Sequence, residues 1–335
     1  MGKNKSLLGL AGPALAMVFF YMAANTWAGD QQAFNIRIAF GSCSDQDKKQ
    51  VMWPAILQKS PDVWLWLGDN IYADTKDPKI MAAKYNKQKN NSDYQKLLAS
   101  SMVLGTWDDN DYGENDADKE FPRKVQSQQL FLDFFDVPKD SPRRTQQGVY
   151  SSHEYSKAGI LLKFYMLDVR YFRDSLEKKN GRYVANQQAS LLGDTQWQWL
   201  EEEFKNSKAD INIIASGIQV IPEDHRWDKW ADFPGERKRL FELVHKYGLR
   251  TPLFISGDRH IGEISRLNYK GRPLYEVTAS SLTHGWGLRR PEVNKHRVGE
   301  IVYDLNFGML EISPTAKRLS LYTREGLVEH LLVGL

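Results

Sequence analysis

The sequence predicts an α/β fold, and two observations support that prediction. Short apolar runs, each ending in polar or small residues, alternate with helix-like segments between residues 36 and 256. That alternation is typical of strands connected by helices. From Tyr275 onward the runs follow one another without intervening helices, which indicates antiparallel strands. No linker rich in proline, glycine or serine divides the chain after residue 28, so we expect one domain.

Each expected strand is a short apolar run, which is the pattern of a buried strand. The first part of the chain contributes Ile36–Phe40, Val63–Leu67, Met102–Trp107, Ile160–Leu167, Ile211–Ala215 and Leu253–Ser256. Helices are expected between these strands at Gln50–Lys59, Val125–Phe135, Asp194–Asn206 and Glu236–Tyr247. The last third contributes antiparallel strands at Tyr275–Ser280, Ile301–Ile312 and Arg318–Tyr322. The polar stretch Lys84–Asn91 is expected to be an exposed loop.

Residues 1–28 have the pattern of a signal peptide. Lys3 and Lys5 precede an apolar block at residues 7–22, and small residues follow, with Thr26 and Ala28 placed before a cleavage site. The alternative is an uncleaved membrane anchor, because the block is close to the length that spans a bilayer. Two glycines and a proline inside the block favour cleavage. We therefore predict an exported protein, periplasmic or secreted, with a mature domain at residues 29–335.

Charge and composition exclude some classes of function. The whole chain has 45 basic and 42 acidic side chains, and Lys3 and Lys5 are the only charges of the first 28 residues. The remainder is therefore close to neutral, which argues against a broad electrostatic platform for nucleic acid or for a membrane surface. With 41% apolar and 26% charged residues, the composition is ordinary for a globular protein. Nothing in it implies a stable protein partner.

The chain contains one cysteine, Cys43, in the FGSCS turn that follows the first expected strand. Export normally leads to an oxidising compartment, where exposed thiols tend to pair. A single cysteine has no partner for an internal disulfide. Cys43 is therefore expected to be buried and inert, paired with another chain, or bound to a metal.

Side chains of the kinds that bind metals follow several expected strands, at the edge where the loops of an α/β sheet converge. They are Cys43 after the first strand, Asp69, Tyr72 and Asp74 after the second, Asp108, Asp109, Asp111 and Asn115 after the third, Asp168, Arg170 and Arg173 after the fourth, and Asp258 and His260 after the sixth. Taken singly, an acidic residue after a strand is more often a helix cap or a turn former. Together these residues would pack anions against one another unless cations were bound. The clustering predicts a metal centre.

The donor set indicates two kinds of metal ion. Thiolate, phenolate, imidazole and a bridging carboxylate suit a trivalent or borderline transition ion, and phenolate favours ferric iron. The carboxylate and amide oxygens around Asp109 and Asn115 suit a hard ion such as calcium or magnesium. A carboxylate-bridged pair of metals is a common device for in-line displacement at phosphorus. We therefore expect a metal-bound hydroxide to hydrolyse a phosphate ester directly, without a covalent intermediate.

Arg170 has two interpretations. Its guanidinium matches phosphate oxygens, or it forms a structural ion pair with Asp168 or with another carboxylate of the site. His225 and His284 lie in expected loops near the rim of a pocket, and each is more simply interpreted as an ordinary loop histidine. The sequence has no G-x-S-x-G elbow, P-loop or H-E-x-x-H motif, so serine hydrolases, P-loop proteins and zincins lack their signatures.

Taken in order, these motifs resemble the PhoD-type alkaline phosphatase and phosphodiesterase family, a part of the calcineurin-like metallophosphoesterases. The motifs that carry the resemblance are FGSCS, WLGDNIYAD, GTWDDNDYGENDADK, LDVRYFR, SGDRHIGEIS and EVTASSLTH, and it extends from Ile36 to Ile312. The resemblance implies a four-layer α/β/β/α metallophosphoesterase sandwich in a single domain, with Fe(3+) and Ca(2+) at the strand ends. By position, it implies that Cys43, Asp69, Tyr72 and His260 bind iron, with Asp69 bridging, and that Asp109, Asn115 and Asp258 bind calcium. Asn110, Asp111 and Arg170 are the predicted catalytic residues, and Arg170 is expected to orient the substrate.

One departure from the family pattern lies at Asn110. The family usually reads WDDH followed by an acid, whereas this chain reads Trp107-Asp108-Asp109-Asn110-Asp111. An amide donates a hydrogen bond but does not shuttle a proton. Slower turnover, a preference for good leaving groups, or another proton donor such as His225 or His284 would follow.

The sequence thus predicts an exported metal-dependent phosphoric ester hydrolase that acts on a small phosphate ester or phosphodiester. Its substrate pocket is expected to be built by the segments 75–100, 222–235 and 283–299. Two alternatives remain: a phospholipase-like or nuclease-like phosphodiesterase, and a catalytically impaired relative that binds metal and serves as a binding module. A structural or cell-surface interaction protein fits the residues less well.

Overall fold

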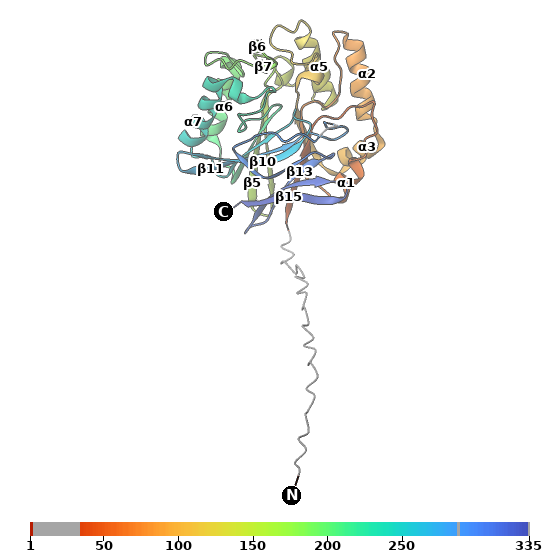
Figure 1. Cartoon of the computed structure of the whole chain (residues 1–335). Helices are drawn as coiled ribbons and strands as arrows, with labels where there is room; N and C mark the ends of the chain where they lie inside the picture. Colours follow the sequence, from red (N-terminus) through yellow and green to blue (C-terminus); the bar gives the residue numbers. More distant parts are fainter. Residues whose placement is uncertain (3–33, 287–288, 334–335) are drawn as a thin grey trace. The chain divides into compact units, whose positions relative to one another are not determined.

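Two large β-sheets face each other in the computed structural model, which describes residues 1–2, 34–286 and 289–333 (Figure 1). Within these residues, the first sheet has the strand order β15-β14-β13-β1-β2-β3 and the second has the order β12-β10-β11-β9-β8-β5-β4. The first sheet consists of β1 (Ile36–Gly41), β2 (Val63–Leu67), β3 (Met102–Thr106), β13 (Phe307–Ile312), β14 (Lys317–Thr323) and β15 (Gly326–Val333). The second consists of β4 (Ser151–Lys157), β5 (Ile160–Met166), β8 (Ile211–Ser216), β9 (Pro252–Ser256), β10 (Gly262–Tyr269), β11 (Arg272–Ala279) and β12 (Arg297–Val302). A short hairpin pairs β6 (Lys178–Lys179) with β7 (Arg182–Tyr183).

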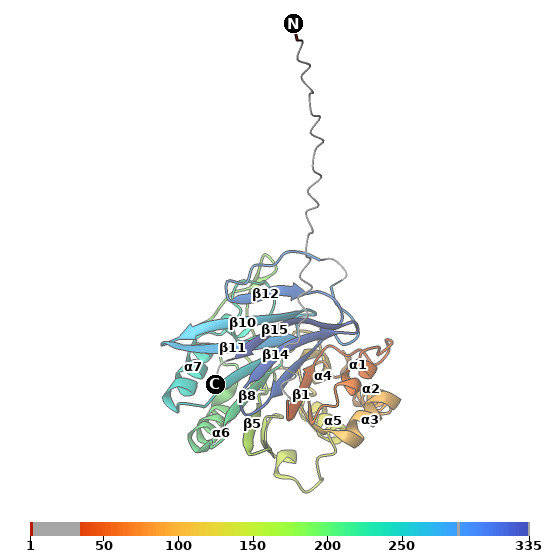
Figure 2. The ribbon, with the colours of Figure 1, turned by 90° about the horizontal axis from the view of Figure 1, so that it is seen from below.

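Helices lie on the outer side of each sheet, as Figures 1 and 2 both show. Beside the first sheet are α1 (Trp53–Gln58), α2 (Pro78–Lys89), α3 (Ser92–Ser100), α4 (Asp109–Tyr112) and α5 (Lys124–Phe134). Beside the second are α6 (Gly193–Asn206) and α7 (Pro234–Lys246). Two single turns of 3-10 helix, η1 (Pro142–Arg144) and η2 (Trp230–Asp232), lie in the connections.

The sequence of β2, Val-Trp-Leu-Trp-Leu, shows why both faces of a sheet are covered. All five residues are buried, and successive side chains of a strand point to opposite faces. Leu65 and Leu67 belong to the core between the sheets, whereas Trp64 and Trp66 belong to the core beneath the helices. Apolar residues on both faces are typical of a parallel strand inside a sheet.

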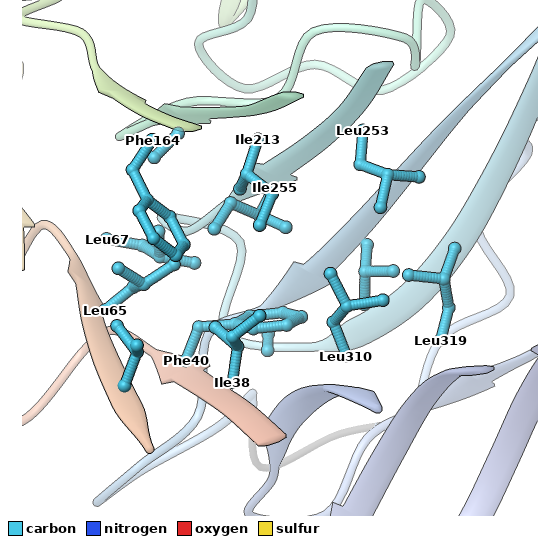
Figure 3. Packing of buried hydrophobic residues seen from close by; sticks show 14 of the residues in the cluster. Ile38, Phe40, Leu65, Leu67, Phe164, Ile213, Leu253, Ile255, Leu310 and Leu319 are labelled. Atoms are coloured by element: carbon cyan, nitrogen blue, oxygen red, sulfur yellow. The ribbon is translucent and has the colours of Figure 1, made fainter. Parts of the chain in front are cut away.

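The core between the sheets is formed by aliphatic and phenylalanine side chains. Figure 3 shows Phe40 and Leu65 of the first sheet directed toward Phe164, Ile213 and Ile255 of the second. A further core lies between each sheet and its helices, with many aromatic residues next to the first sheet. The order of layers is therefore helix, sheet, sheet, helix, which confirms the predicted four-layer sandwich.

The strands and helices expected up to residue 256 are all present, with ends that differ by a few residues. The loop expected at Lys84–Asn91 is wrong, because most of it belongs to α2. Asp77 caps that helix by accepting a hydrogen bond from the backbone amide of Lys79 at 2.8 Å, and Met81 and Tyr85 are buried. The strand expected at Ile301–Ile312 is in fact two strands, the end of β12 and the whole of β13, separated by a turn.

The described residues from Phe34 onward form one compact unit. The predicted signal peptide lies, apart from Met1 and Gly2, outside the described residues. None of the helices in the described ranges is long and apolar enough to cross a membrane.

Candidate metal centre

The carboxyl ends of β1, β2, β3 and β9 deliver most of the predicted metal ligands to one place. Strands β1, β2 and β3 are parallel neighbours, so the turns that follow them lie side by side. One ligand atom each from Cys43, Asp69 and His260 lie within 4.8 Å of one another, and the same holds for Asp69, Asp108 and Asp109. We call these sets the thiol group and the carboxylate group. Asp69 belongs to both.

Short contacts join the members of the thiol group to one another and to Tyr72. The Oδ2 atom of Asp69 accepts hydrogen bonds from the Tyr72 hydroxyl at 3.2 Å and from the Cys43 thiol at 3.5 Å. The Tyr72 oxygen also lies 3.0 Å from Nε2 of His260. Four side chains from three loops therefore direct their donor atoms toward one another.

Burial makes these donor atoms hard to ionise in the absence of a cation. Burial, and then the charge of Asp69, raises the pKa of Cys43, and burial, and then Cys43, raises the pKa of Tyr72. Burial and the neighbouring His284 lower the pKa of His260 to about 3, so its imidazole is neutral and has a lone pair for a metal. A bound cation would reverse the shifts of the thiol and the phenol.

The carboxylate group concentrates acidic residues in the same way. Burial, followed by Asp109 and Asp108, raises the pKa of Asp69 well above its usual value. Burial raises the pKa of Asp108 to about 7, and burial and then Asp108 raise the pKa of Asp258. The Oδ2 atom of Asp108 is buried and has no hydrogen-bond partner among the described residues. An unsatisfied carboxylate oxygen amid other carboxylates is the environment that a metal ion would stabilise, so the residues fit a metal centre.

The backbone of the centre is strained at the residues that carry the donors. Cys43, Asp69, Asp258 and His260 have φ values of 58°, 48°, 67° and 53°. These values lie in the left-handed region, which side chains with a Cβ disfavour. Gly68 also has a positive φ of 93°, and a Cβ there would come within 2.5 Å of the Cβ of Asp108. Glycine at this position lets the second and third turns approach each other.

Asp111 holds this arrangement together. Its carboxylate accepts hydrogen bonds from the backbone amides of Asp108 at 2.7 Å, of Asp69 at 3.2 Å and of Asn70 at 3.2 Å, and from the Asn70 side chain at 2.6 Å. It therefore connects the turn after β2 to the start of α4. These contacts occupy both oxygens and support a positioning role for Asp111, and its catalytic role stays a prediction.

Arg170 is fully buried and forms ion pairs within the site. Its Nε lies 2.6 Å from Asp108 Oδ1, and its Nη1 lies 3.0 Å from Asp228 Oδ2. Asp168 is not its side-chain partner, because the Asp168 carboxylate accepts the backbone amide of Arg170 at 2.9 Å and the indole of Trp107 at 2.7 Å. The structural ion pair expected for Arg170 therefore exists with Asp108, another carboxylate of the site, and a second pair joins Arg170 to Asp228. Sequence reasoning missed Asp228, which no motif marks.

Asn110 and Asn115 lie in different surroundings. Asn110 is buried, and its amide Nδ2 donates to Asp109 Oδ1 at 3.3 Å. Asn115 is exposed on the loop after α4, where its backbone amide hydrogen-bonds the Asp74 carboxylate. Asp108 lies in the buried carboxylate group, where Asn115 had been expected. The metal-binding role of Asn115 stays a prediction.

A cavity of about 710 Å³ opens next to the thiol group. It is lined by residues of the segments 224–227 and 290–293, with Arg182, Arg259, Ile261, Trp286, Ile301 and Tyr303. Two of the three segments expected to build a pocket, 222–235 and 283–299, therefore do so. The segment 75–100, most of which forms α2 and α3, contributes no residue to this lining.

The carboxylate group predicts how the stability of the metal-free protein depends on pH. An acid whose pKa is raised on folding binds its proton more tightly in the folded state, so stability falls as pH rises from about 4, the pKa of an unfolded aspartate. For Asp108 this fall continues up to its folded pKa of about 7. Chelator-treated protein is therefore expected to melt at a higher temperature near pH 5 than near pH 8, in a series of thermal melts. The Asp108→Asn variant should show a shallower decline, and a wild-type melting temperature that rises across this window would contradict the prediction.

Comparison with known proteins identifies a family that matches most of the chain. The family model of PhoD-like phosphatases matches residues 38–306. Over 203 residues the chain is 26% identical to alkaline phosphatase D of Bacillus subtilis (strain 168), a match that covers 53% of this chain and 33% of that protein. The chain thus matches about a third of the length of this relative.

Solved structures share the fold. The structure of PhoD superposes with a TM-score of 0.73 at 17% identity and covers 90% of this chain and 69% of that one. Purple acid phosphatase PPD1 from seeds of yellow lupin (Lupinus luteus) gives a TM-score of 0.62 at 13% identity and covers 90% of this chain and 54% of that one.

Proposed function

Because the chain belongs to the PhoD-like phosphatase family, we propose that it is an exported, metal-dependent phosphoric ester hydrolase that acts on phosphate monoesters and diesters. The observation that carries this proposal is the position of Asp69, whose carboxylate is common to the thiol group and the carboxylate group. A carboxylate shared by two sets of donors suits a two-metal centre for phosphoryl transfer. The signal-peptide pattern of residues 1–28 supports export.

The two groups suit different ions. Cys43, Asp69, Tyr72 and His260 would hold Fe(3+), and Asp69 with Asp109, Asp258 and Asn115 would hold Ca(2+), with Asp108 as a further oxygen donor. When bound, such ions would supply Lewis-acid stabilisation of the negative charge on the phosphoryl and leaving-group oxygens and would activate water as the nucleophile. Attack by water on phosphorus needs no covalent bond to the protein.

The protein's own side chains supply positive charge and hydrogen-bond donors to the site. Arg170, held by Asp108 and Asp228, keeps a positive charge beside the carboxylate group. The Asn110 amide lies next to Asp109, where it would donate a hydrogen bond to a phosphoryl or leaving-group oxygen. Burial lowers the pKa of both His225 and His284, so neither is an imidazolium that could protonate the leaving group near neutral pH. We therefore propose a preference for esters with good leaving groups.

Asn110 also favours a second candidate, a catalytically impaired relative that binds metal and acts as a binding module. An assay of ester hydrolysis distinguishes the hydrolase from the binding module. Protein that contains its metals and hydrolyses p-nitrophenyl phosphate or bis-p-nitrophenyl phosphate is an enzyme, and protein that contains them and hydrolyses neither supports the binding module. A panel of lipid and nucleotide diesters separates the phospholipase-like and nuclease-like alternatives.

The Cys43→Ser variant tests the assignment of the thiol group. Elemental analysis of the wild type is expected to show iron, and its visible spectrum a charge-transfer band from the Tyr72 phenolate to iron. Cys43→Ser should lose the iron or shift this band, because a hydroxyl is a weaker ligand than a thiolate. Ser44→Ala, a change in the same buried turn, should keep both. A colourless, iron-free wild type with full phosphatase activity would contradict the assignment.

A further inference from the structure

The cavity of about 710 Å³ lies directly beside the candidate metal centre. Two of its lining residues, Arg259 and Ile261, flank His260 in the sequence. A third, Trp286, has its ring centroid 5.3 Å from that of His260. A substrate whose phosphorus lies at the metal centre would thus have this cavity within reach of its organic part.

The walls of the cavity combine flat aromatic surfaces with positive charge. Trp227 stacks on Trp286 with ring centroids 4.8 Å apart, and the guanidinium of Arg226 lies 4.9 Å from the ring of Trp227. Four arginines line the cavity, against the acidic residues Asp224 and Glu292. The excess of positive charge favours an anionic ligand, and the aromatic surfaces favour a planar or apolar one.

Two buried lining residues have hydrogen-bond donors or acceptors that no described residue satisfies. Arg259 is 1% exposed, and although its Nη2 pairs with Glu292, its Nε and Nη1 have no partner among the described residues. His225 is 5% exposed, and its Nε2 is also unsatisfied. Buried polar atoms without partners are uncommon, because each costs the free energy of its lost hydration. A ligand with its own oxygen atoms would satisfy them.

We propose that this cavity binds the leaving-group side of the substrate and selects phosphate esters whose planar or apolar alcohol carries a second anionic group. This inference rests on the proposed function, since it takes phosphorus to be bound at the metal centre. The aromatic walls receive the body of the alcohol. Arg259, with the other arginines, pairs with its second anion, which is a carboxylate or a second phosphate.

Two isosteric phosphonates test the proposal by binding, without any turnover. In 4-carboxyphenylphosphonate the group para to phosphorus is anionic, and in 4-carbamoylphenylphosphonate it is neutral. Isothermal titration of the metal-containing protein is expected to show tighter binding of the carboxylate by about tenfold or more, the usual effect of a hydrogen bond to a charged group. In Arg259→Met the ratio of the two affinities should fall to near one. Arg250 is an exposed arginine that pairs with Asp210, and Arg250→Met should keep the wild-type ratio.

Arg259 lies between two predicted metal ligands, so the metal content of Arg259→Met is measured first. If that variant loses metal, Arg226→Met on the exposed side of the cavity replaces it, and a severalfold loss of the preference is expected there. Equal affinity of the wild type for the two phosphonates, or a preference that both variants retain, overturns the proposal. Hydrolysis of p-nitrophenyl phosphate is assayed in parallel. If the protein hydrolyses p-nitrophenyl phosphate but does not prefer the carboxylate phosphonate, the proposed role of the cavity is wrong and the proposed function stands. If it prefers the carboxylate phosphonate but hydrolyses nothing, the proposed activity is wrong and the role of the cavity is supported.

Discussion

Replacement of Asp69 by asparagine is expected to lower kcat/KM for p-nitrophenyl phosphate by about a thousandfold or more, because changes one shell further from a metal already cost ten- to a hundredfold. Asp69 contributes to both the thiol group and the carboxylate group. An amide has no negative charge to hold two cations together. Steady-state kinetics and elemental analysis of the same preparation measure both consequences, and metal content should fall together with activity.

The Asp136→Asn variant is the matched control for this change. Asp136 has a left-handed backbone like that of Asp69, with φ of 53° against 48°, and its side chain is exposed. The Asp136→Asn variant should therefore have the kcat/KM and the metal content of the wild type. Chelator-treated Asp69→Asn is expected to be at least as stable as chelator-treated wild type, because the substitution removes a buried acid with a raised pKa. Retained metal and activity in Asp69→Asn would refute a bridging role.

The Arg170→Met variant is expected to lower the free energy of unfolding by about 3–5 kcal/mol, the usual effect of removing one partner of a buried ion pair. Arg170, Asp108 and Asp228 are all buried. Methionine fills much of the volume of arginine but leaves Asp108 without its counter-ion, whereas Asp228 keeps Arg173 at 3.2 Å. Urea unfolding followed by circular dichroism measures the change.

An exposed arginine provides the comparison for Arg170→Met. Arg250 pairs with Asp210 at 2.9 Å on the surface, so Arg250→Met should change stability by less than about 1 kcal/mol. Adding Asp108→Asn to Arg170→Met should recover part of the loss, since the carboxylate that has lost its counter-ion is then replaced by a neutral amide. An equal effect of the two single variants would show that the Arg170 ion pairs contribute little.

The parts of the fold that could be predicted from the sequence are the strands whose side chains are buried on both faces, because burial requires apolar residues there. Strands such as β2 are apolar on both faces, and a short apolar run between polar turns is typical of a strand buried inside a sheet. Helix α2 was missed because its sequence is rich in lysine and asparagine and has no clear apolar face. Its position depends on tertiary contacts of Met81 and Tyr85 and on a hydrogen bond of 3.1 Å from Gln88 to Gln50.

The candidate site was predictable to the extent that it follows strand ends. Cys43, Asp69 and His260 come directly after β1, β2 and β9, so the topology alone brings them together. The partners of Arg170 were not predictable in this way. Asp228 lies in an irregular connection between β8 and α7, and its distance from Arg170 depends on how that connection folds back. The cavity likewise depends on loops whose path no local pattern determines.

The left-handed backbone of Cys43, Asp69, Asp258 and His260 has a consequence for how such a site changes under selection. Each of these residues stores strain of about 1 kcal/mol or more that glycine would relieve. Selection for thermostability without the metals would therefore favour glycine at these four positions, and the resulting proteins would be more stable but would have lost the donors. Stability of the metal-free protein and the supply of donor atoms are therefore opposed at the same backbone positions.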